Sequence, residues 1–297
     1  MAEELSYSAL NERSAPVRRH PEWLKVRMPG GLGYTKTKAI VTAFKLNTVC
    51  QEAQCPNIGE CWGHGTATFM LMGDVCTRNC RFCAVSHGRM VELDPDEPRR
   101  VAEAAHKMDL SHIVVTSVNR DDLSDGGAAH FAATVQSLKE LNPSCTIEVL
   151  TPDFQGNEEA VVIVARSPIE IYNHNTETVP RLYKKVRPGA KYERSLRVLE
   201  KAKEVRADLK TKTGLMLGLG ETYEELLTVF GDLRAVHCDI LTLGQYLRPS
   251  KEQLPVERYV HPDEFTALRE EALNLGFRHV EAGPLVRSSY HAWKHVL

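Results

Sequence analysis

The sequence lacks long hydrophobic runs and any strong net charge. Its longest apolar stretches, HIVVTSV (112–118) and AVVIVA (160–165), are far too short to span a bilayer. A formal net charge of −2 gives no large basic field that would attract nucleic acid or an anionic membrane. Residues 1–19 contain no apolar signal segment. We therefore expect a cytoplasmic chain whose partners include neither nucleic acid nor a membrane.

Two common motifs of site chemistry are also missing. No H-E-x-x-H zinc pattern occurs among the 12 histidines. The run Gly218-Leu219-Gly220-Glu221 lacks the third glycine of a dinucleotide fingerprint and follows a late strand, which argues against a nicotinamide cofactor. These absences leave the cysteines as the most informative residues.

A fourth cysteine is missing from the densest cysteine motif. Cys76, Cys80 and Cys83 form C-x3-C-x2-C in DVCTRNCRFCAV, and no further cysteine follows nearby. Crowded thiolates select zinc or iron–sulfur clusters, and both structural zinc sites and ferredoxin clusters take four protein ligands. Three ligands on a 4Fe–4S cube leave one iron open to a small molecule, so the spacing indicates a reactive cluster. The alternative is a zinc site that lacks its fourth ligand or takes His87 as that ligand.

A second triplet lies directly upstream of the first. Cys50, Cys55 and Cys61 form C-x4-C-x5-C in TVCQEAQCPNIGECW. A disulfide framework is the weaker explanation, because such frameworks belong to small secreted domains. The other two cysteines, Cys145 and Cys238, lie in apolar runs where cysteine usually serves as a small buried hydrophobe.

The first triplet, with Phe82 directly before its last cysteine, resembles the signature loop of the radical S-adenosylmethionine (SAM) enzymes. The resemblance implies that a cluster on Cys76, Cys80 and Cys83 binds SAM at its open iron and cleaves it to a 5′-deoxyadenosyl radical, which abstracts hydrogen. The order of the two triplets resembles the lipoyl synthase family, and this resemblance runs from about residue 45 to 292. Its further motifs are TSVNRDDLSDGG (116–127), YNHNTETV (172–179), RPGAKYERSL (187–196), GLMLGLGET (214–222) and GPLVRSSYHA (283–292). The stretch before Lys45 is the least diagnostic part.

Short β-rich runs alternate with helical patterns, which predicts βα units and a parallel sheet. The expected strands are 68–72, 112–117, 146–150, 169–173, 213–219 and 240–246. The expected helices lie at 98–108, 129–141, 195–205 and 222–236. The resemblance implies a fold of the α/β class, a partial, TIM-like (β/α)6 barrel of the radical SAM type. We expect an N-terminal extension with the auxiliary-cluster cysteines (1–64), the barrel (65–260) and a C-terminal extension with the RSSYH motif (261–297).

Polar residues follow every expected strand, as an active-site rim at the carboxyl ends of barrel strands requires. From this rim, together with Phe82, we expect the residues that contact SAM. Glu221 is assigned to a ribose hydroxyl or the adenine side of the cofactor, and Asn173 to orienting substrate or cofactor. The full set is Phe82, Thr116, Ser117, Asn119, Asn173, Glu221 and Arg248.

The resemblance also supplies the fourth ligand of the second cluster. It implies that Ser289, which precedes the tyrosine of RSSYH, completes the set of Cys50, Cys55 and Cys61, with Ser288 as the adjacent alternative. An alkoxide oxygen is a harder ligand than thiolate, which suggests a bond meant to be released.

The resemblance implies insertion of two sulfur atoms at carbons six and eight of a protein-bound octanoyl-lysine chain, with the auxiliary 4Fe–4S cluster as the sacrificial donor. The implied partners are an octanoylated lipoyl carrier domain or glycine-cleavage H protein, an electron donor such as flavodoxin or ferredoxin, and an iron–sulfur carrier that rebuilds the cluster. The alternatives are a radical SAM enzyme whose auxiliary cluster is only redox-active, a zinc-binding interaction module, and a cluster-assembly scaffold.

Overall fold

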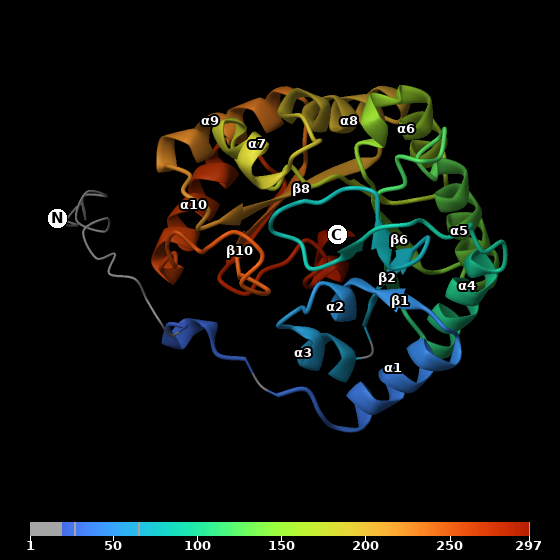
Figure 1. The fold of residues 1–297 in the computed structure, drawn as a ribbon. Coiled ribbons are helices and arrows are strands. Elements are labelled where there is room, and N and C mark those ends of the chain that lie inside the picture. Colours follow the sequence, from blue (N-terminus) through green and yellow to red (C-terminus); the bar gives the residue numbers. More distant parts are fainter. Residues whose placement is uncertain (1–19, 27, 65, 297) are drawn as a thin grey trace.

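The computed structural model describes residues 20–26, 28–64 and 66–296. Figure 1 looks into a ring of strands with helices around its outside, and the C-terminal segment lies within the ring. The strands are β1 (Asn47–Thr48), β2 (Thr68–Leu71), β3 (Val75–Cys76), β4 (Ser86–His87), β5 (His112–Ser117), β6 (Thr146–Leu150), β7 (Ile171–Asn173), β8 (Lys210–Leu217), β9 (Ile240–Gln245) and β10 (His279–Gly283).

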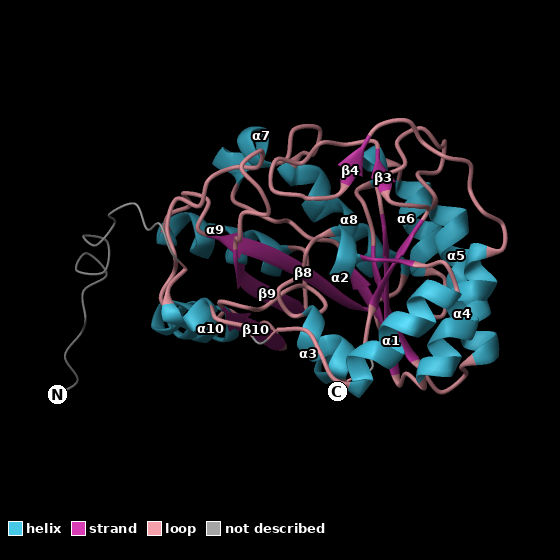
Figure 2. Cartoon of the chain, turned by 60° about the horizontal axis from the view of Figure 1, so that its bottom comes forward, coloured by secondary structure: helices cyan, strands magenta, loops and turns pink. Residues whose placement is uncertain are grey.

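The helices alternate with these strands, and Figure 2 shows the chain coloured by element type. The α-helices are α1 (Leu32–Ala43), α2 (Val49–Glu52), α3 (Ile58–Gly63), α4 (Glu97–Met108), α5 (Ala128–Leu141), α6 (Glu158–Ala165), α7 (Tyr183–Val186), α8 (Tyr192–Val205), α9 (Tyr223–Ala235) and α10 (Pro262–Asn274). Short 3-10 turns are η2 (Glu22–Leu24), η3 (Phe154–Gly156), η4 (Pro180–Leu182) and η5 (Ala292–Val296). No helix of the described residues is both long enough and apolar enough to cross a bilayer.

The main sheet runs β1-β2-β5-β6-β7-β8-β9-β10, and every pair in it is parallel except β1–β2. The parallel α/β arrangement is confirmed, and the six expected strands are all present, although β7 is shorter than predicted and β8 begins and ends earlier. Two strands of the main sheet were not predicted: β1, which is only two residues long, and β10. The short strands β3 and β4, which form a separate two-stranded sheet, were not predicted either. The strand β10 lies in the predicted C-terminal extension and pairs with β9, so this part of the chain continues the sheet.

Side chains of each strand alternate between the helices and the inside of the ring. Leu215 and Leu217 of β8 pack in the same apolar cluster as the side chains of α9. The alternate residue, Lys212, points inward, where its Nζ donates to both carboxylate oxygens of Glu148 at 2.8 Å. Both side chains are fully buried, and the mutual neutralisation offsets part of the cost of burying the two charges.

The expected helix starts and stops have local causes. Thr222 and Glu225 form a capping box at the start of α9. Pro98 lies in the first turn of α4, and Asp109 ends that helix in a left-handed conformation. All four predicted helices are confirmed within three residues at each end.

The C-terminal segment after β10 fills the side of the ring between β2 and β10, which do not pair with each other among the described strands. Gly244 of β9 makes room for this segment, since the carbonyl oxygen of Val286 occupies the place that a β-carbon at Gly244 would take. The segment therefore lies directly against the inner face of the sheet.

Candidate active site

The loop that carries the first triplet leaves β3 and returns as β4, above the carboxyl end of β5. The backbone N–H of Asn119, just after β5, donates to Sγ of Cys76 at 3.3 Å. Thr77 fixes the same contact, because its N–H donates to the carbonyl oxygen of Asn119 at 3.1 Å. Val85 N–H donates to Sγ of Cys83 at 3.4 Å. Such N–H···S bonds stabilise thiolate charge and tune bound iron–sulfur clusters.

Arg78, inside the cysteine loop, ties that loop to the ends of two strands. Its guanidinium donates to Asp121, after β5, at 2.6 and 2.8 Å, and to Asp153, after β6, at 2.6 Å. Arg194 of α8 donates to the other oxygen of Asp153 at 3.1 Å. Burial opposes ionisation of Asp153, but the hydrogen bonds and charge of Arg78 lower its pKa to about 2. The loop is therefore held by a charged network that is largely shielded from solvent.

A cavity of about 180 Å³ lies between this loop and the strand ends. Its wall includes Oγ of Ser117 and the side-chain oxygens of Asn119 and Asn175, which are buried and have no hydrogen-bond partner among the described residues. Buried polar atoms in native proteins normally find partners. This cavity can therefore receive a polar ligand that donates to these oxygens.

Besides Arg78 and the three cysteines, the ionisable residues that line this cavity come from the stretch between β7 and α8. Glu177 has a raised pKa because of burial, although Arg187 and the amide of Asn175 act in the opposite direction. Arg187 donates to the carbonyl oxygen of Asn175 at 2.9 Å. Nδ1 of His174 lies 2.9 Å from the carbonyl oxygen of Thr151, and burial lowers the pKa of His174 to about 4. The imidazole of His174 is therefore neutral at physiological pH.

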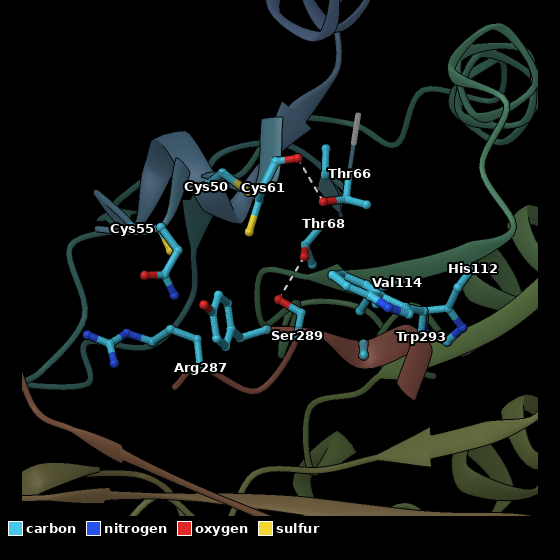
Figure 3. A pocket seen from close by; sticks show the side chains of 14 residues that line it. Cys50, Cys55, Cys61, Thr66, Thr68, His112, Val114, Arg287, Ser289 and Trp293 are labelled. Atoms are coloured by element: carbon cyan, nitrogen blue, oxygen red, sulfur yellow. Dashed lines mark hydrogen bonds between the residues drawn. The ribbon is translucent and has the colours of Figure 1, made fainter. Parts of the chain in front are cut away.

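The second triplet is assembled from two distant parts of the chain (Figure 3). Cys50 lies on α2, Cys61 on α3 and Cys55 between them. Opposite the cysteines lies the C-terminal segment, whose Ser289 Oγ accepts a hydrogen bond from Oγ1 of Thr68 at 2.8 Å. The three cysteines and Ser289 surround a cavity of about 40 Å³. The structure therefore brings together all four predicted ligands of the second cluster.

Three further contacts fasten the C-terminal segment to the stretch that carries Cys50, Cys55 and Cys61. Nδ2 of Asn57 donates to the carbonyl oxygen of Leu285 at 2.7 Å. The hydroxyl of Tyr290 donates to the Glu60 carboxylate at 3.0 Å, and Nε2 of His291 lies 3.3 Å from the same carboxylate. Glu60 directly precedes Cys61, so this contact links the serine side of the site to the cysteine side.

Burial favours the neutral thiol form of five cysteines in the two triplets, namely Cys50, Cys55, Cys61, Cys80 and Cys83. Burial raises the pKa of Cys50 to about 11 and those of Cys61 and Cys83 to about 12. Burial also raises the pKa of Cys55, against the charge of Arg287, and that of Cys80, against the charge of Arg187. Metal binding must therefore displace protons from these thiols.

The spacing of the sulfur atoms argues against a single metal ion. In neither triplet do all three Sγ atoms lie within 4.8 Å of one another, within the part of the chain that the structure describes. A tetrahedral zinc ion with bonds of about 2.3 Å would hold its sulfur ligands about 3.8 Å apart. The donor sets and their spacing therefore fit multi-iron clusters better than zinc, and His87 is an exposed residue of β4.

A larger cavity of about 340 Å³ joins the two triplets. Cys50 and Cys55 line it from one side and Cys83 from the other, and Ser288 and Ser289 also reach it. More of its lining is apolar than polar. The apolar side chains include Val49, Phe82, Leu215, Met216, Leu247 and Val286, and the charged ones are Glu177, Arg248 and Arg287. An apolar chain that enters this cavity can thus reach the edges of both cysteine sites.

The predicted cofactor residues divide into two groups. Thr116, Ser117, Asn119 and Phe82 line the cavity beside the first triplet. Asn173 instead donates to Glu148 at 2.7 Å inside the ring, and Glu221 accepts from the N–H groups of Gly218 and Leu219 at 2.6 and 2.9 Å. Arg248 lines the larger cavity, while its Nε donates to the carbonyl oxygen of Gln253 at 2.8 Å.

Sequence reasoning did not single out Arg78, Glu177 and Arg187. Arg78 lies within the cysteine loop, and the other two lie within the quoted motifs 172–179 and 187–196. The only indication of their roles in the sequence was that they are charged residues within motifs of the proposed site. Their partners depend on side chains from several strands, which the sequence does not place.

Comparisons with known proteins agree with this geometry. A model described as the radical SAM superfamily matches residues 70–233, and one described as the N-terminal domain of lipoyl synthase matches residues 2–55. The chain is 56% identical over 98% of its length, and 95% of the relative's, to a lipoyl synthase of Koribacter versatilis (strain Ellin345). It is 57% identical to a lipoyl synthase of Caldanaerobacter subterraneus subsp. tengcongensis, over 92% of this chain and 96% of the relative.

Two solved structures share the fold at low sequence identity. Methylornithine synthase matches with a TM-score of 0.54 and 14% identity, over 82% of this chain and 81% of that chain. Streptococcus suis SuiB bound to S-adenosylmethionine matches with a TM-score of 0.58 and 13% identity, over 77% of this chain and 54% of that chain. The match to residues 2–55 extends the likeness to the lipoyl synthase family into the stretch before Lys45.

Proposed function

Because the chain belongs to the lipoyl synthase family of radical SAM enzymes, we propose that its two cysteine triplets hold two 4Fe–4S clusters with different tasks. The family's reaction inserts sulfur at carbons six and eight of an octanoyl group carried on a protein lysine. A cluster held by Cys76, Cys80 and Cys83 would supply the electron that cleaves SAM to methionine and the hydrogen-abstracting radical, and a cluster held by the other triplet would supply the sulfur. The observation that carries this division is the single cavity of about 340 Å³ that reaches both triplets.

In this proposal Cys76, Cys80 and Cys83 hold the first cluster, with N–H donors from Asn119 and Val85 at two of the sulfurs. Thr116, Ser117, Asn119 and Phe82 form the wall that receives SAM. Asn173, Glu221 and Arg248 support the strand ends and loops around that wall, because their side-chain bonds are made within the protein.

Cys50, Cys55, Cys61 and Ser289 hold the auxiliary cluster in the proposal. Arg287, which lines the same cavity, places a positive charge near Cys55 and favours the thiolate form of this ligand. The apolar wall of the larger cavity orients the octanoyl arm by excluding water from it. Such a site needs only the arm of the substrate to enter, while the carrier domain remains outside.

The partners and the location are part of the proposal. They are an octanoylated lipoyl carrier domain or glycine-cleavage H protein, an electron donor such as flavodoxin or ferredoxin, and an iron–sulfur carrier. A cytoplasmic location supports six thiolate ligands, because a reducing compartment keeps the cysteines from forming disulfides.

A pair of variants tests the division of tasks. Cys80→Ala should reduce 5′-deoxyadenosine formation at least about 100-fold, since an outer-shell change alone costs up to that much. Cys55→Ala should keep uncoupled formation of 5′-deoxyadenosine but give no lipoyl product from an octanoylated peptide. Cys145→Ala, at a buried cysteine outside both triplets, is the matched control.

Equal loss of SAM cleavage in both variants would contradict the division. The rival reading, an auxiliary cluster that only transfers electrons, is tested in wild-type enzyme by iron and sulfide analysis after a single turnover. A redox cluster remains intact, whereas a sulfur donor loses sulfide.

A further inference from the structure

A histidine-rich group lies at the opposite end of the strands from the cysteine loop. The ligand atoms of His279, Glu281 and His295 all lie within 4.8 Å of one another. We propose that these three side chains form a binding site for a divalent metal ion, zinc by the chemistry of its donors, which fastens the C-terminal segment to β10. The proposal does not depend on the assignment of the two iron–sulfur sites.

The backbone places two of the three ligands on one face. His279 and Glu281 are alternate residues of β10, and the residue between them, Val280, packs in the apolar cluster with α10. Their side chains therefore point to the inside of the ring. Nε2 of His279 lies 3.5 Å from Oε2 of Glu281.

The third ligand comes from η5 at the C-terminal end of the described chain. The ring of His295 lies with its centroid 4.5 Å from that of His279, at an interplanar angle of 49°. This contact joins the segment that carries Ser289 to the last strand of the sheet, whereas Ser289 itself bonds to Thr68 of β2. A metal ion bound here would hold the C-terminal segment from its far end.

The second observation is that His295 is buried without partners. The residue is 2% exposed, and neither ring nitrogen has a hydrogen-bond partner within residues 20–26, 28–64 and 66–296. Nε2 of His279 is also buried, and among the described residues its polar contact is the Glu281 carboxylate at 3.5 Å, beyond a well-formed hydrogen bond. Buried imidazole nitrogens are normally satisfied, and a metal ion would satisfy one nitrogen of each ring.

Burial keeps both imidazole rings in the neutral form that binds metal. Burial, and then the nearby charge of Lys212, lower the pKa of His295 to about 2. Burial also lowers the pKa of His279, against the charge of Glu281. Both rings are neutral at pH 7, and each offers a lone pair. The Lys212 charge that would repel a cation is compensated by Glu148, whose two oxygens lie 2.8 Å from it.

The donors select the metal. Two imidazoles and one carboxylate, with a fourth position for water, are a common set for zinc, whereas iron–sulfur clusters prefer thiolates. The chain would thus keep zinc and iron apart by ligand chemistry. With one carboxylate and two neutral imidazoles as ligands, a divalent ion gives the site a net charge of +1. This is less charge in the interior than the +2 of an uncompensated ion.

The test uses the full chain with both clusters reconstituted, so that the cysteines are occupied. It is equilibrated with zinc ions alone and then freed of loosely bound metal. We expect about one zinc per chain, with nitrogen and oxygen ligands at about 2.0–2.1 Å by X-ray absorption and no sulfur at about 2.3 Å. Zinc should also raise the unfolding temperature by about 3 °C or more.

Two variants and one control decide the outcome. His295→Gln and His279→Gln should lose the zinc and the thermal shift, while His106→Ala, an exposed histidine on α4, should keep both. His279 is more exposed than His295, so its variant serves if His295→Gln fails to fold. Absence of retained zinc, a sulfur shell, or equal zinc in the Gln variants overturns the proposal. Iron measured in the same samples reports separately on the clusters.

Discussion

The two cysteine sites are built in different ways. The Cys76–Cys83 loop is fixed to the neighbouring ends of β5 and β6 by Arg78 and by backbone bonds of Thr77. The Cys50–Cys61 site instead closes only when the C-terminal segment arrives, through bonds such as Thr68–Ser289, which spans 221 residues of sequence. The first site lies at the carboxyl ends of the strands. The second site is assembled from residues 50–61 and the C-terminal segment after β10.

This difference matches the tasks we assign to the sites. A cluster that works repeatedly needs fixed ligands, and a buried charge network provides them. A cluster that is consumed must be released and rebuilt, and a site closed by a few hydrogen bonds to one segment can open without unfolding the sheet. The following changes should separate the two kinds of construction.

The largest effect is expected from Arg78→Gln. The variant removes the charge that ties the cysteine loop to Asp121 and Asp153, and it leaves the buried Asp153 with Arg194 as its charged partner. Displacement of a reacting group by about 1 Å can cost about 100-fold in rate, so 5′-deoxyadenosine formation should fall by about that factor. The rate is measured by quenching the reaction at successive times and quantifying the 5′-deoxyadenosine formed.

The matched control for Arg78 is Arg99→Gln, which removes an exposed ion pair with Glu103 on α4. It should leave the rate within about twofold. If Arg78→Gln also leaves SAM cleavage unchanged, the network does not position the loop, and the contrast between the two sites is lost.

Ser289→Ala should affect the second site alone. Loss of the proposed oxygen ligand should lower lipoyl product about 10–100-fold, while 5′-deoxyadenosine formation stays within about threefold. Ser288→Ala, one residue earlier in the same segment, is the control and should change product little. A larger loss in the Ser288 variant would move the ligand assignment to Ser288.

The sequence predicted the sheet better than the site. Helices and inner strands follow from periodic apolar patterns, and all of those predicted are present. The strand β10 was missed because its residues His279 and Glu281 are polar, so the run HVEAG lacks the apolar pattern of an inner strand. Those same polar residues point inward toward His295.

Cysteine spacing pointed to both proposed cluster sites, because the cysteines of each triplet are close together in sequence. The cofactor wall was harder to predict. Asn173 is the last residue of the expected strand and of β7, and its side chain turns inside the ring of strands to Glu148. Which of two neighbouring polar residues faces a cavity depends on the exact end of a strand, and β7 is a short strand of three residues.

A smaller effect is expected from Glu60→Gln. The amide can still accept from Tyr290, but the hydrogen bond loses its charge, which costs about 1 kcal/mol or about fivefold. Lipoyl product should fall by that factor, and 5′-deoxyadenosine formation should not change. Glu140→Gln, at an exposed position on α5, is the control. A wild-type rate for Glu60→Gln would show that the contact does not seat the segment.

The smallest difference between the sites is expected in the pH dependence of cluster loading. Burial raises the pKa of Cys61 and of Cys83 to about 12, so a thiol in each site is protonated at pH 7–9. Iron binding releases those protons, and loading should therefore become more favourable as the pH rises from 7 to 9. We expect cluster loading at the two sites to increase by the same factor, within about twofold, because burial is the main cause of the raised thiol pKa in both sites. Cluster absorbance during reconstitution of Cys80→Ala and Cys55→Ala measures each site separately. Opposite pH trends in the two variants would mean that local charges, Arg187 in one site and Arg287 in the other, outweigh burial in setting the proton count.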